Sequence, residues 1–378
     1  MSGAVVLAAG GTGGHLFPAE AVAGELLHRG HIVHLVTDRR ADAFAASLPA
    51  IARHRVRAGR IGGGPVAAAY GVAELMLGLV QARRLLRRIA PAAVIGFGGY
   101  PSLPTMLAAA QLGLPTAIHE QNAVMGRANR LLAPRMGLIA TGFAAAAGLR
   151  TADSARAVHT GNPVRPEILA IGDSGYAPPD PERPIEVLIL GGSQGAHALS
   201  EIVPAALIAL PGSLRARLRV SQQARPEDLG AVASQYQANG IAAELAPFFE
   251  DVPSRLGRAH LVICRAGAST VAELAAAGRP ALLVPYPHAA DDHQSANARA
   301  FAEAGGGWVM PQAALSAAIL SDRLRSLLGS PGILAQAAAQ AHGFARRDAA
   351  EQLATLALAA KPKVEPAARK PAARERAA

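Results

Sequence analysis

The chain has 378 residues, of which 51% are apolar and 4% aromatic. Its length suits two ordinary domains, and its composition excludes a chain that is disordered throughout. The formal charge of +10 favours anionic partners such as phosphates, nucleic acid or an acidic membrane face, although an arginine excess is also typical of GC-rich genomes.

The sequence carries no sign of secretion. The N-terminus, MSGAVVLAAGG, lacks a basic segment, and its apolar run is short for a signal peptide. No uninterrupted apolar stretch is long enough to span a bilayer. The single cysteine, Cys264, excludes an internal disulfide, and its apolar setting predicts a buried structural thiol rather than a nucleophile. We therefore expect a cytoplasmic protein that can still touch a membrane.

Short β-branched runs alternate with helical patterns from the start of the chain. This order predicts a doubly wound α/β domain with a parallel sheet. The expected strands are Val5–Ala9, Ile32–Val36, Val94–Phe97, Thr116–His119 and Leu138–Thr141, and the expected helices include Phe17–Arg29, Leu103–Leu112 and Val124–Ala133.

The same pattern begins again after a loop at residues 170–184, which is rich in Pro, Gly and Asp. A strand within residues 185–190 enters a glycine turn, and further strands are expected at Leu218–Ser221, Leu261–Cys264 and Ala281–Pro285. Two such halves predict two similar domains that face each other across a cleft, with ligands beyond the carboxyl ends of the strands. A last helix is expected at about residues 344–360, and the basic segment 361–378 is expected to be disordered.

A glycine turn, Gly10-Gly11-Thr12-Gly13-Gly14-His15, follows the first strand. Glycines let the backbone approach a ligand, and the helix that follows points its N–H groups and positive dipole end at an anionic or hydroxyl-rich group. The turn does not match the G-x-G-x-x-G dinucleotide fingerprint. Asp38 follows the second strand, however, so this motif alone leaves a dinucleotide enzyme open.

His15 lies in the first turn of the helix that follows this loop. The helix dipole disfavours the charged imidazole, and a neutral imidazole is able to act as a general base toward a hydroxyl. The alternative is a helix-capping or surface histidine.

Three further segments suit a nucleotide sugar. The turn Gly191–Ala196 adds a hydroxyl and an amide for phosphate or ribose oxygens, and Thr270 and Glu273 follow the strand that ends at Cys264. Glu273 is able to accept hydrogen bonds from a ribose diol, or else it caps the helix. The stretch 285–297 is dense in polar groups, as a sugar site requires. Its Asp and His residues also leave a metal site open, although no ligand-spaced motif is present.

Several motifs resemble the MurG family of UDP-N-acetylglucosamine:lipid I N-acetylglucosaminyltransferases, which act in peptidoglycan synthesis. They lie between residue 10 and about residue 298, in the family's order, and HEQN followed by GRANR is specific because a generic αβ fold needs neither half. The matching segments are GGTGGHLFPA, GFGGYPSLP, HEQNAVMGRANR, GNPVR, LGGSQGA and CRAGASTVAELAAAGRPALLVPYPHAADDHQSANA.

This resemblance implies the GT-B architecture, with two Rossmann-like doubly wound domains facing across a cleft. The family's crossover lies near Gly161–Arg165, earlier than the Pro-rich loop at which the composition alone would divide the chain. We therefore expect an acceptor- and membrane-facing domain at 1–163 plus 342–360, a donor domain at 164–341 and a disordered basic tail at 361–378.

The resemblance also implies site residues and partners. The expected partners are UDP-N-acetylglucosamine, lipid I, an anionic membrane surface and cell-wall synthesis proteins, with no nucleic acid and no cofactor or metal. The donor is expected at Thr12, Gly13, Gly14, Asn122, Arg165, Ser193, Phe249, Glu273 and Gln294, and the acceptor side at Tyr100, Asn129 and Asn297. Where some members have adjacent glutamines, this chain has His293 followed by Gln294.

The implied reaction removes a proton from the acceptor 4-hydroxyl while UDP leaves with negative charge. Attack from the face opposite UDP inverts the anomeric centre and gives a β-1,4 linkage. His15 is the candidate base, with Glu120 and His119 as competing choices. Glycine-loop amides and helix N-termini are able to stabilise the diphosphate without a metal.

Residues 66–90 combine an apolar stretch with an arginine cluster. Such a helix suits the interface of an anionic membrane, and the alternative is an ordinary amphipathic helix with a solvated basic face. A lipid-linked acceptor favours the membrane, with contacts at Leu75, Met76, Leu79, Arg83, Arg84, Arg87 and Arg88.

Rival functions remain to be separated. One rival is another enzyme of the same fold, such as a glycolipid synthase or a UDP-sugar epimerase. The HEQN and GRANR pair argues against both, because neither enzyme needs these motifs. A nucleic-acid-binding protein would need aromatic side chains for stacking, which are scarce here. A catalytically silent scaffold would not need His15, Glu120 and Glu273 together.

Overall fold

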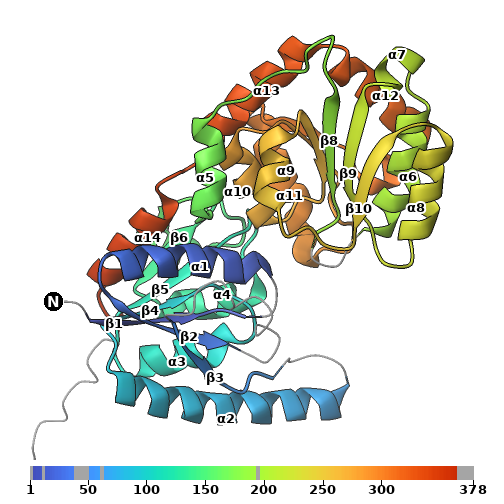
Figure 1. Ribbon diagram of the computed structural model, residues 1–378. Coiled ribbons are helices and arrows are strands. Elements are labelled where there is room, and N and C mark those ends of the chain that lie inside the picture. Colours follow the sequence, from blue (N-terminus) through green and yellow to red (C-terminus); the bar gives the residue numbers. More distant parts are fainter. Residues whose placement is uncertain (1–2, 11–12, 38–50, 60–63, 193–195, 364–378) are drawn as a thin grey trace, which may run out of the picture.

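The protein, a computed structural model, is described here for residues 3–10, 13–37, 51–59, 64–192 and 196–363. It contains two parallel β-sheets, each covered by helices on both faces (Figure 1). The two sheets have the same doubly wound plan, with the strand order reversing in the middle of each sheet.

The first sheet has the strand order β3-β2-β1-β4-β5-β6-β7. Its interior strands are apolar because helices bury both faces, and the core of this domain lies on either side of them. Its elements are β1 (Ala4–Ala8), α1 (Gly13–His28), β2 (Ile32–Thr37), β3 (Ala52–Arg55), α2 (Pro65–Ile89), β4 (Ala93–Gly96), α3 (Ser102–Gln111), β5 (Thr116–Glu120), α4 (Arg127–Leu132), β6 (Leu138–Thr141) and β7 (Ala157–His159).

The second sheet has the order β10-β9-β8-β11-β12-β13 and its own core on both faces. Its elements are α5 (Pro166–Asp173), β8 (Ile185–Leu190), α6 (His197–Ile208), α7 (Gly212–Arg215), β9 (Leu218–Gln223), α8 (Leu229–Ala238), β10 (Ala242–Ala246), α9 (Val252–Arg258), β11 (Leu261–Cys264), α10 (Ala268–Ala277), β12 (Ala281–Leu283), α11 (His293–Glu303), β13 (Gly307–Val309), α12 (Ala317–Leu328) and α13 (Pro331–Phe344). Cys264 is fully buried, as expected from its apolar setting.

The C-terminal helix α14 (Ala349–Ala359) returns to the first domain, where it packs beside α1 (Figure 1). The expected helix at 344–360 is wrong at its start. Phe344 ends α13 and packs in the second core, and the chain is extended at Ala345. The expected loop at 170–184 also needs correction, because residues 170–173 form the last turn of α5.

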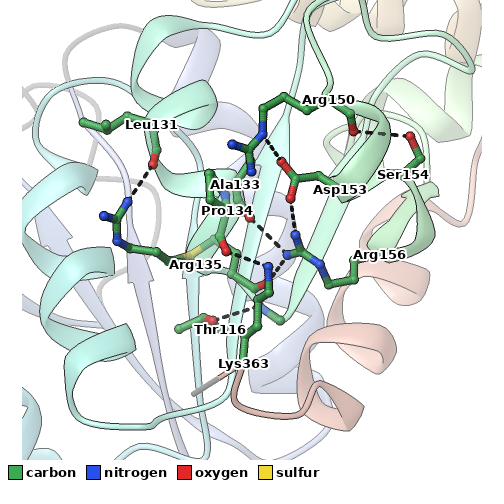
Figure 2. A network of polar contacts seen from close by, with 12 residues as sticks. Thr116, Leu131, Ala133, Pro134, Arg135, Arg150, Asp153, Ser154, Arg156 and Lys363 are labelled. Atoms are coloured by element: carbon green, nitrogen blue, oxygen red, sulfur yellow. Dashed lines mark hydrogen bonds and ion pairs between the residues drawn. The ribbon is translucent and has the colours of Figure 1, made fainter. Parts of the chain in front are cut away.

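The first residues of the expected tail lie against the first domain. Lys363 Nζ donates a hydrogen bond to the carbonyl of Pro134 at 2.6 Å. Figure 2 shows this contact beside the network in which the carboxylate of buried Asp153 binds both Arg150 and Arg156. Because Arg156 also donates to the carbonyl of Ala133, the network fixes the segment on which Lys363 lies. Residues 364–378 lie outside the described part of the chain.

Candidate functional site

The functional motifs gather where the strand order of each sheet reverses. In the first domain the turns after β1, β4 and β5 lie together, and in the second domain the turns after β8, β11 and β12 do. Ligands of doubly wound sheets bind at such points. The two sets meet across the domain interface, because α1 packs against α10 and Ser269 Oγ donates to the carbonyl of Gly14 at 3.4 Å. Gly13 opens α1 in this turn, while Thr12 and Ser193 lie outside the described residues.

His15 lies in the first turn of α1 and is half-buried. Its ring packs over Gly98 and Gly99, which have φ of +86° and +76°; a Cβ added at either glycine would lie within 3.4 Å of the imidazole. Its Nδ1 lies 3.1 Å from Gln121 Oε1. Burial lowers the pKa of His15, while Glu120, the bond to Gln121 and the Phe97 carbonyl raise it. The structure therefore holds a mainly neutral imidazole at this position at neutral pH.

His119 and Glu120, the competing choices for the base, are both fully engaged by protein groups. The ring of His119 is completely buried, with Nε2 at 2.9 Å from the Gly161 carbonyl and Nδ1 at 3.1 Å from Gln121 Nε2. Burial lowers its pKa to about 4. Glu120 Oε1 accepts from the backbone and side-chain amides of Asn122. These contacts leave neither ring nitrogen of His119 exposed to a ligand.

The other oxygen of Glu120 shapes the loop before α4. Glu120 Oε2 accepts from Gly126 N at 2.9 Å and from Asn129 Nδ2 at 2.8 Å. These bonds hold residues 121–126 out of the helix. The helix α4 therefore begins at Arg127, and our prediction that it begins at Val124 was wrong. Asn129 Oδ1 is buried without a partner among the described residues, and Tyr100 is half-buried just after Gly99. An unpaired buried oxygen suits an incoming hydroxyl donor.

Asn122 and Asn297 join the two domains rather than standing open to solvent. The fully buried Asn297 accepts from Ala123 N at 2.8 Å, and its Nδ2 donates to Asn122 Oδ1 and to the Ala266 carbonyl, each at 3.1 Å. One side chain thus connects the loop after β5 with the turn after β11.

A second bridge between the domains uses charge. Asp291 accepts a hydrogen bond from Arg130 in α4, and Arg127 lies 3.9 Å from the same carboxylate oxygen. Asp291 and Asp292 have φ of 52° and 51°, in the left-handed region that non-glycine residues rarely adopt. Such strain is concentrated at functional sites. It lies here in the segment predicted to meet the sugar, just before His293.

Arg165 and Glu273 come from the junction before α5 and from α10. Arg165 donates from Nε and Nη2 to Glu273 Oε1 at 3.2 and 2.9 Å. The guanidinium also lies 4.9 Å from the centroid of the Phe17 ring on α1. Burial raises the pKa of Glu273, and Arg165 opposes this shift. The predicted ribose carboxylate is thus paired with a cation at the domain interface.

Gln294 and Phe249 lie in the second domain. Gln294 Oε1 accepts from Ala266 N and Tyr286 N at 3.2 and 2.9 Å, so it joins the turns after β11 and β12. Phe249 is buried, with the Arg255 guanidinium 4.0 Å from its ring centroid, while the adjacent Phe248 is 60% exposed.

Sequence reasoning missed three buried polar residues that support this site. Gln121 links His15 with His119, and Gln223 accepts from Gly191 N and donates to the Gly192 carbonyl, both at 3.1 Å. Arg265 donates to the carbonyls of Val284 and Pro285. A signal was present, because each follows directly on a buried strand or ends one, and a polar residue buried there needs partners.

The arginine-rich helix α2 runs along the edge of the first domain farthest from the second (Figure 1). Three of its predicted membrane contacts are not on the fully exposed face: Leu75 and Leu79 are partly buried against the core, and Arg83 is half-buried. Leu75, Leu79, Ala82 and Leu86 share one face at helical spacing. The opposite face, termed here the α2 stripe, is exposed and consists of Tyr70, Val72, Met76, Leu77, Val80, Arg84, Arg87 and Arg88.

Over the described ranges, no helix is long and apolar enough to cross a membrane. Within the same residues, no three His, Cys, Asp or Glu side chains are grouped so as to hold a metal ion.

Comparison with known proteins identifies the family. Residues 5–141 match the glycosyltransferase family 28 N-terminal domain, and residues 186–353 match its C-terminal domain. The UDP-N-acetylglucosamine--N-acetylmuramyl-(pentapeptide) pyrophosphoryl-undecaprenol N-acetylglucosamine transferase of Rhodospirillum centenum is 58% identical over 356 residues, 94% of each chain. The protein of the same name from Paramagnetospirillum magneticum is 56% identical over 93% of this chain and 95% of its own.

Solved structures agree with this assignment. The crystal structure of Acinetobacter baumannii MurG has a TM-score of 0.76 and 30% identity, covering 94% of this chain and 98% of that one. The calicheamicin glycosyltransferase, at a TM-score of 0.62 and 17% identity, shares the fold. The chain therefore belongs to glycosyltransferase family 28, as a hexosyltransferase of the MurG group with the two-domain GT-B fold.

Proposed function

We propose that the chain transfers N-acetylglucosamine from UDP-N-acetylglucosamine to the 4-hydroxyl of the N-acetylmuramyl sugar in lipid I, giving lipid II. The observation that carries this proposal is the near-complete match to transferases of that name, 58% identical over 94% of both chains. The polar groups that gather where the strand order of each sheet reverses support it, because they are of the kinds that a nucleotide sugar and a hydroxyl acceptor need.

His15 is the proposed general base. The acceptor hydroxyl gives its proton to the imidazole as its oxygen bonds to the anomeric carbon, and the bond from that carbon to UDP breaks with its electron pair leaving on the diphosphate. Attack opposite to UDP gives an inverted, β-linked product without a covalent enzyme intermediate. The lowered pKa of His15 supports this role, since a base must be unprotonated at working pH.

The diphosphate and ribose are proposed to lie on the second domain. The N-terminal ends of α6 and α10 supply positive dipole ends and backbone N–H groups for negative charge. Glu273 uses Oε1 for Arg165, so Oε2 is the oxygen proposed to accept from the ribose. Stabilisation by these groups would let the transfer proceed without a metal, which is a prediction for assay.

The α2 stripe is proposed to dock on the anionic cytoplasmic face of the inner membrane, where a lipid-linked acceptor resides. Along one helix face, its exposed apolar side chains are followed directly by exposed arginines. That combination suits partial burial between headgroups and acyl chains.

The test is transfer of labelled N-acetylglucosamine to a short-chain lipid I analogue, with EDTA present. We compare wild type with His15→Ala and with His28→Ala, which removes an exposed histidine from the same helix. Metal-independent transfer that falls at least about a hundredfold only in His15→Ala, with UDP binding retained, supports the function and the base. Transfer that survives in His15→Ala keeps the function and removes the base. No transfer by folded wild type overturns the proposed function.

A further inference from the structure

Gln121 lies between the two histidines of the site. It is the first residue after β5 and is 1% exposed. Its side-chain amide contacts both His15 and His119. Its role depends on which end of the amide faces which ring, and the surrounding groups determine this.

The orientation can be followed from the Gly161 carbonyl. That oxygen only accepts, so His119 Nε2, at 2.9 Å, carries the proton. Because burial lowers the pKa of His119 to about 4, the ring is neutral at pH 7 and Nδ1 keeps its lone pair. Gln121 Nε2 lies 3.1 Å from this lone pair and therefore donates to it.

Two backbone carbonyls fix the same end of the amide. Gln121 Nε2 lies 2.9 Å from the Phe97 carbonyl and 3.1 Å from that of His119. A reversed amide would direct its oxygen at these two carbonyls and at a ring lone pair, with no donor among them. The nitrogen must occupy this position, so Oε1 faces His15.

We infer that Gln121 is a positioning residue that fixes the tautomer of His15. Gln121 Oε1 only accepts, so His15 Nδ1, 3.1 Å away, carries the proton. In the neutral ring the lone pair is then on Nε2. The relay from Gly161 through His119 and Gln121 thus determines which nitrogen of His15 is basic.

The charged groups around His15 act on its proton affinity rather than on this choice. Glu120 raises its pKa, and His293 from the second domain lowers it, as does burial. The choice between the two ring nitrogens depends on the acceptor at Nδ1. The tautomer assignment rests on the hydrogen-bond geometry around Gln121 together with a neutral His119 ring, and its catalytic consequence rests on the proposed role of His15.

The experiment is ¹⁵N NMR of histidine-labelled full-length protein, with the His15 signals assigned by their absence in His15→Ala. In wild type above the His15 pKa we expect a protonated Nδ1 and an unprotonated Nε2. In Gln121→Leu we expect both tautomers, while Gln237→Leu, an exposed glutamine on α8, should match wild type. A wild-type proton on Nε2, or an unchanged tautomer in Gln121→Leu, overturns the inference.

Transfer kinetics separate positioning from general damage. Gln121→Leu should lower kcat about a hundredfold, with the KM for UDP-N-acetylglucosamine within about twofold of wild type. Gln121→Glu keeps an acceptor at Nδ1 but adds charge, so the acid limb of its kcat/KM profile should move up by about one pH unit. An unmoved limb, or equal losses in KM and kcat, contradicts the positioning role. If His15→Ala remains active while the NMR result holds, the base assignment fails and the tautomer assignment stands.

Discussion

Arg165 binds Glu273 through one carboxylate oxygen only, with Nε and Nη2 both directed at Oε1. The pair is partly buried at the domain interface, where Arg165 also covers Phe17. The arginine has two effects on a carboxylate whose pKa burial already raises: it favours the ionised form, and it leaves Oε2 for another donor.

This arrangement predicts that Arg165→Ala makes donor binding depend on pH. Without the arginine the pKa of Glu273 rises further, so the carboxyl takes up a proton at a higher pH and stops accepting from the ribose as pH falls. The KM for UDP-N-acetylglucosamine should rise about tenfold between about pH 8 and pH 6 in the variant, and by less than about twofold in wild type. Initial rates across this range measure the effect. Arg165→Ala/Glu273→Gln has no group left to titrate there, so a persisting dependence contradicts the explanation.

Because His15 packs on Gly99, we predict that Gly99→Ala lowers kcat in addition to lowering the free energy of unfolding. Gly99→Ala adds a Cβ 3.2 Å from the Gly10 carbonyl oxygen and 3.3 Å from the His15 ring at a φ of +76°, whereas Gly30→Ala meets no atom within 4 Å at a φ of +79°. Both should lose about 1 kcal/mol of unfolding free energy from the left-handed backbone, and Gly99→Ala should lose more because the Gly10 carbonyl is crowded as well. Only Gly99→Ala should also lose about tenfold or more in kcat, because the imidazole moves. Urea unfolding and transfer rates of the two variants decide this, and equal activities would show that the contact is unimportant.

Among the described residues, every interior strand was predictable from sequence, and every edge strand was missed. The predicted strands are β1, β2, β4, β5 and β6 in one sheet and β8, β9, β11 and β12 in the other, while β3, β7, β10 and β13 are the four edges. Interior parallel strands are buried on both faces and form continuous apolar runs. The edge strands are partly exposed, as in Ala52–Arg55 with the sequence ARHR, and show no such run.

The site was predictable as a set of residue types but not as a set of roles. Motifs located His15, His119 and Glu120, yet only the fold shows that His119 is buried between Gly161 and Gln121 and that Glu120 binds the loop before α4. On α2, selecting residues by apolarity chose Leu75 and Leu79, because composition does not say which helix face the core covers. Hydrogen-bond direction and burial depend on segments far apart in sequence.

The exposed α2 stripe predicts salt-dependent binding to anionic vesicles. Arg84→Gln/Arg87→Gln/Arg88→Gln should weaken binding about a hundredfold at low salt, since each arginine near such a surface contributes about 1 kcal/mol. Met76→Ser/Val80→Ser should weaken it about tenfold by removing apolar contact. The matched control is Ile319→Ser/Ile333→Ser, which removes exposed isoleucines from the second domain. Vesicle sedimentation measures all three, and equal binding by every variant would exclude the stripe as the contact.

The hydrogen bonds of Asn297 predict that the contact between the two domains depends strongly on this one side-chain amide. Asn297→Asp keeps the acceptor for Ala123 N but turns the second oxygen toward Asn122 Oδ1 and the Ala266 carbonyl, so two acceptors face a carboxylate. We expect a loss of about 3 kcal/mol from a buried charge without donors. Urea unfolding measures the loss, and X-ray scattering should report a larger radius of gyration as the domains separate. The exposed Asn239→Asp should change neither quantity.

The low pKa of the buried His119 predicts that the free energy of unfolding falls in mild acid. Its folded-state pKa is about 4, below the ordinary 6.5, so between these values the unfolded chain binds a proton that the folded chain does not. As pH falls through this window the free energy of unfolding should fall by about 3 kcal/mol from this residue. His119→Gln retains an amide to donate to Gly161 but does not titrate, so its loss over the same window should be smaller by that amount. Urea unfolding of both proteins at several pH values tests the difference. Parallel curves for the two proteins would mean that His119 already carries its proton in the folded state, and the relay through Gln121 would then start from the wrong charge.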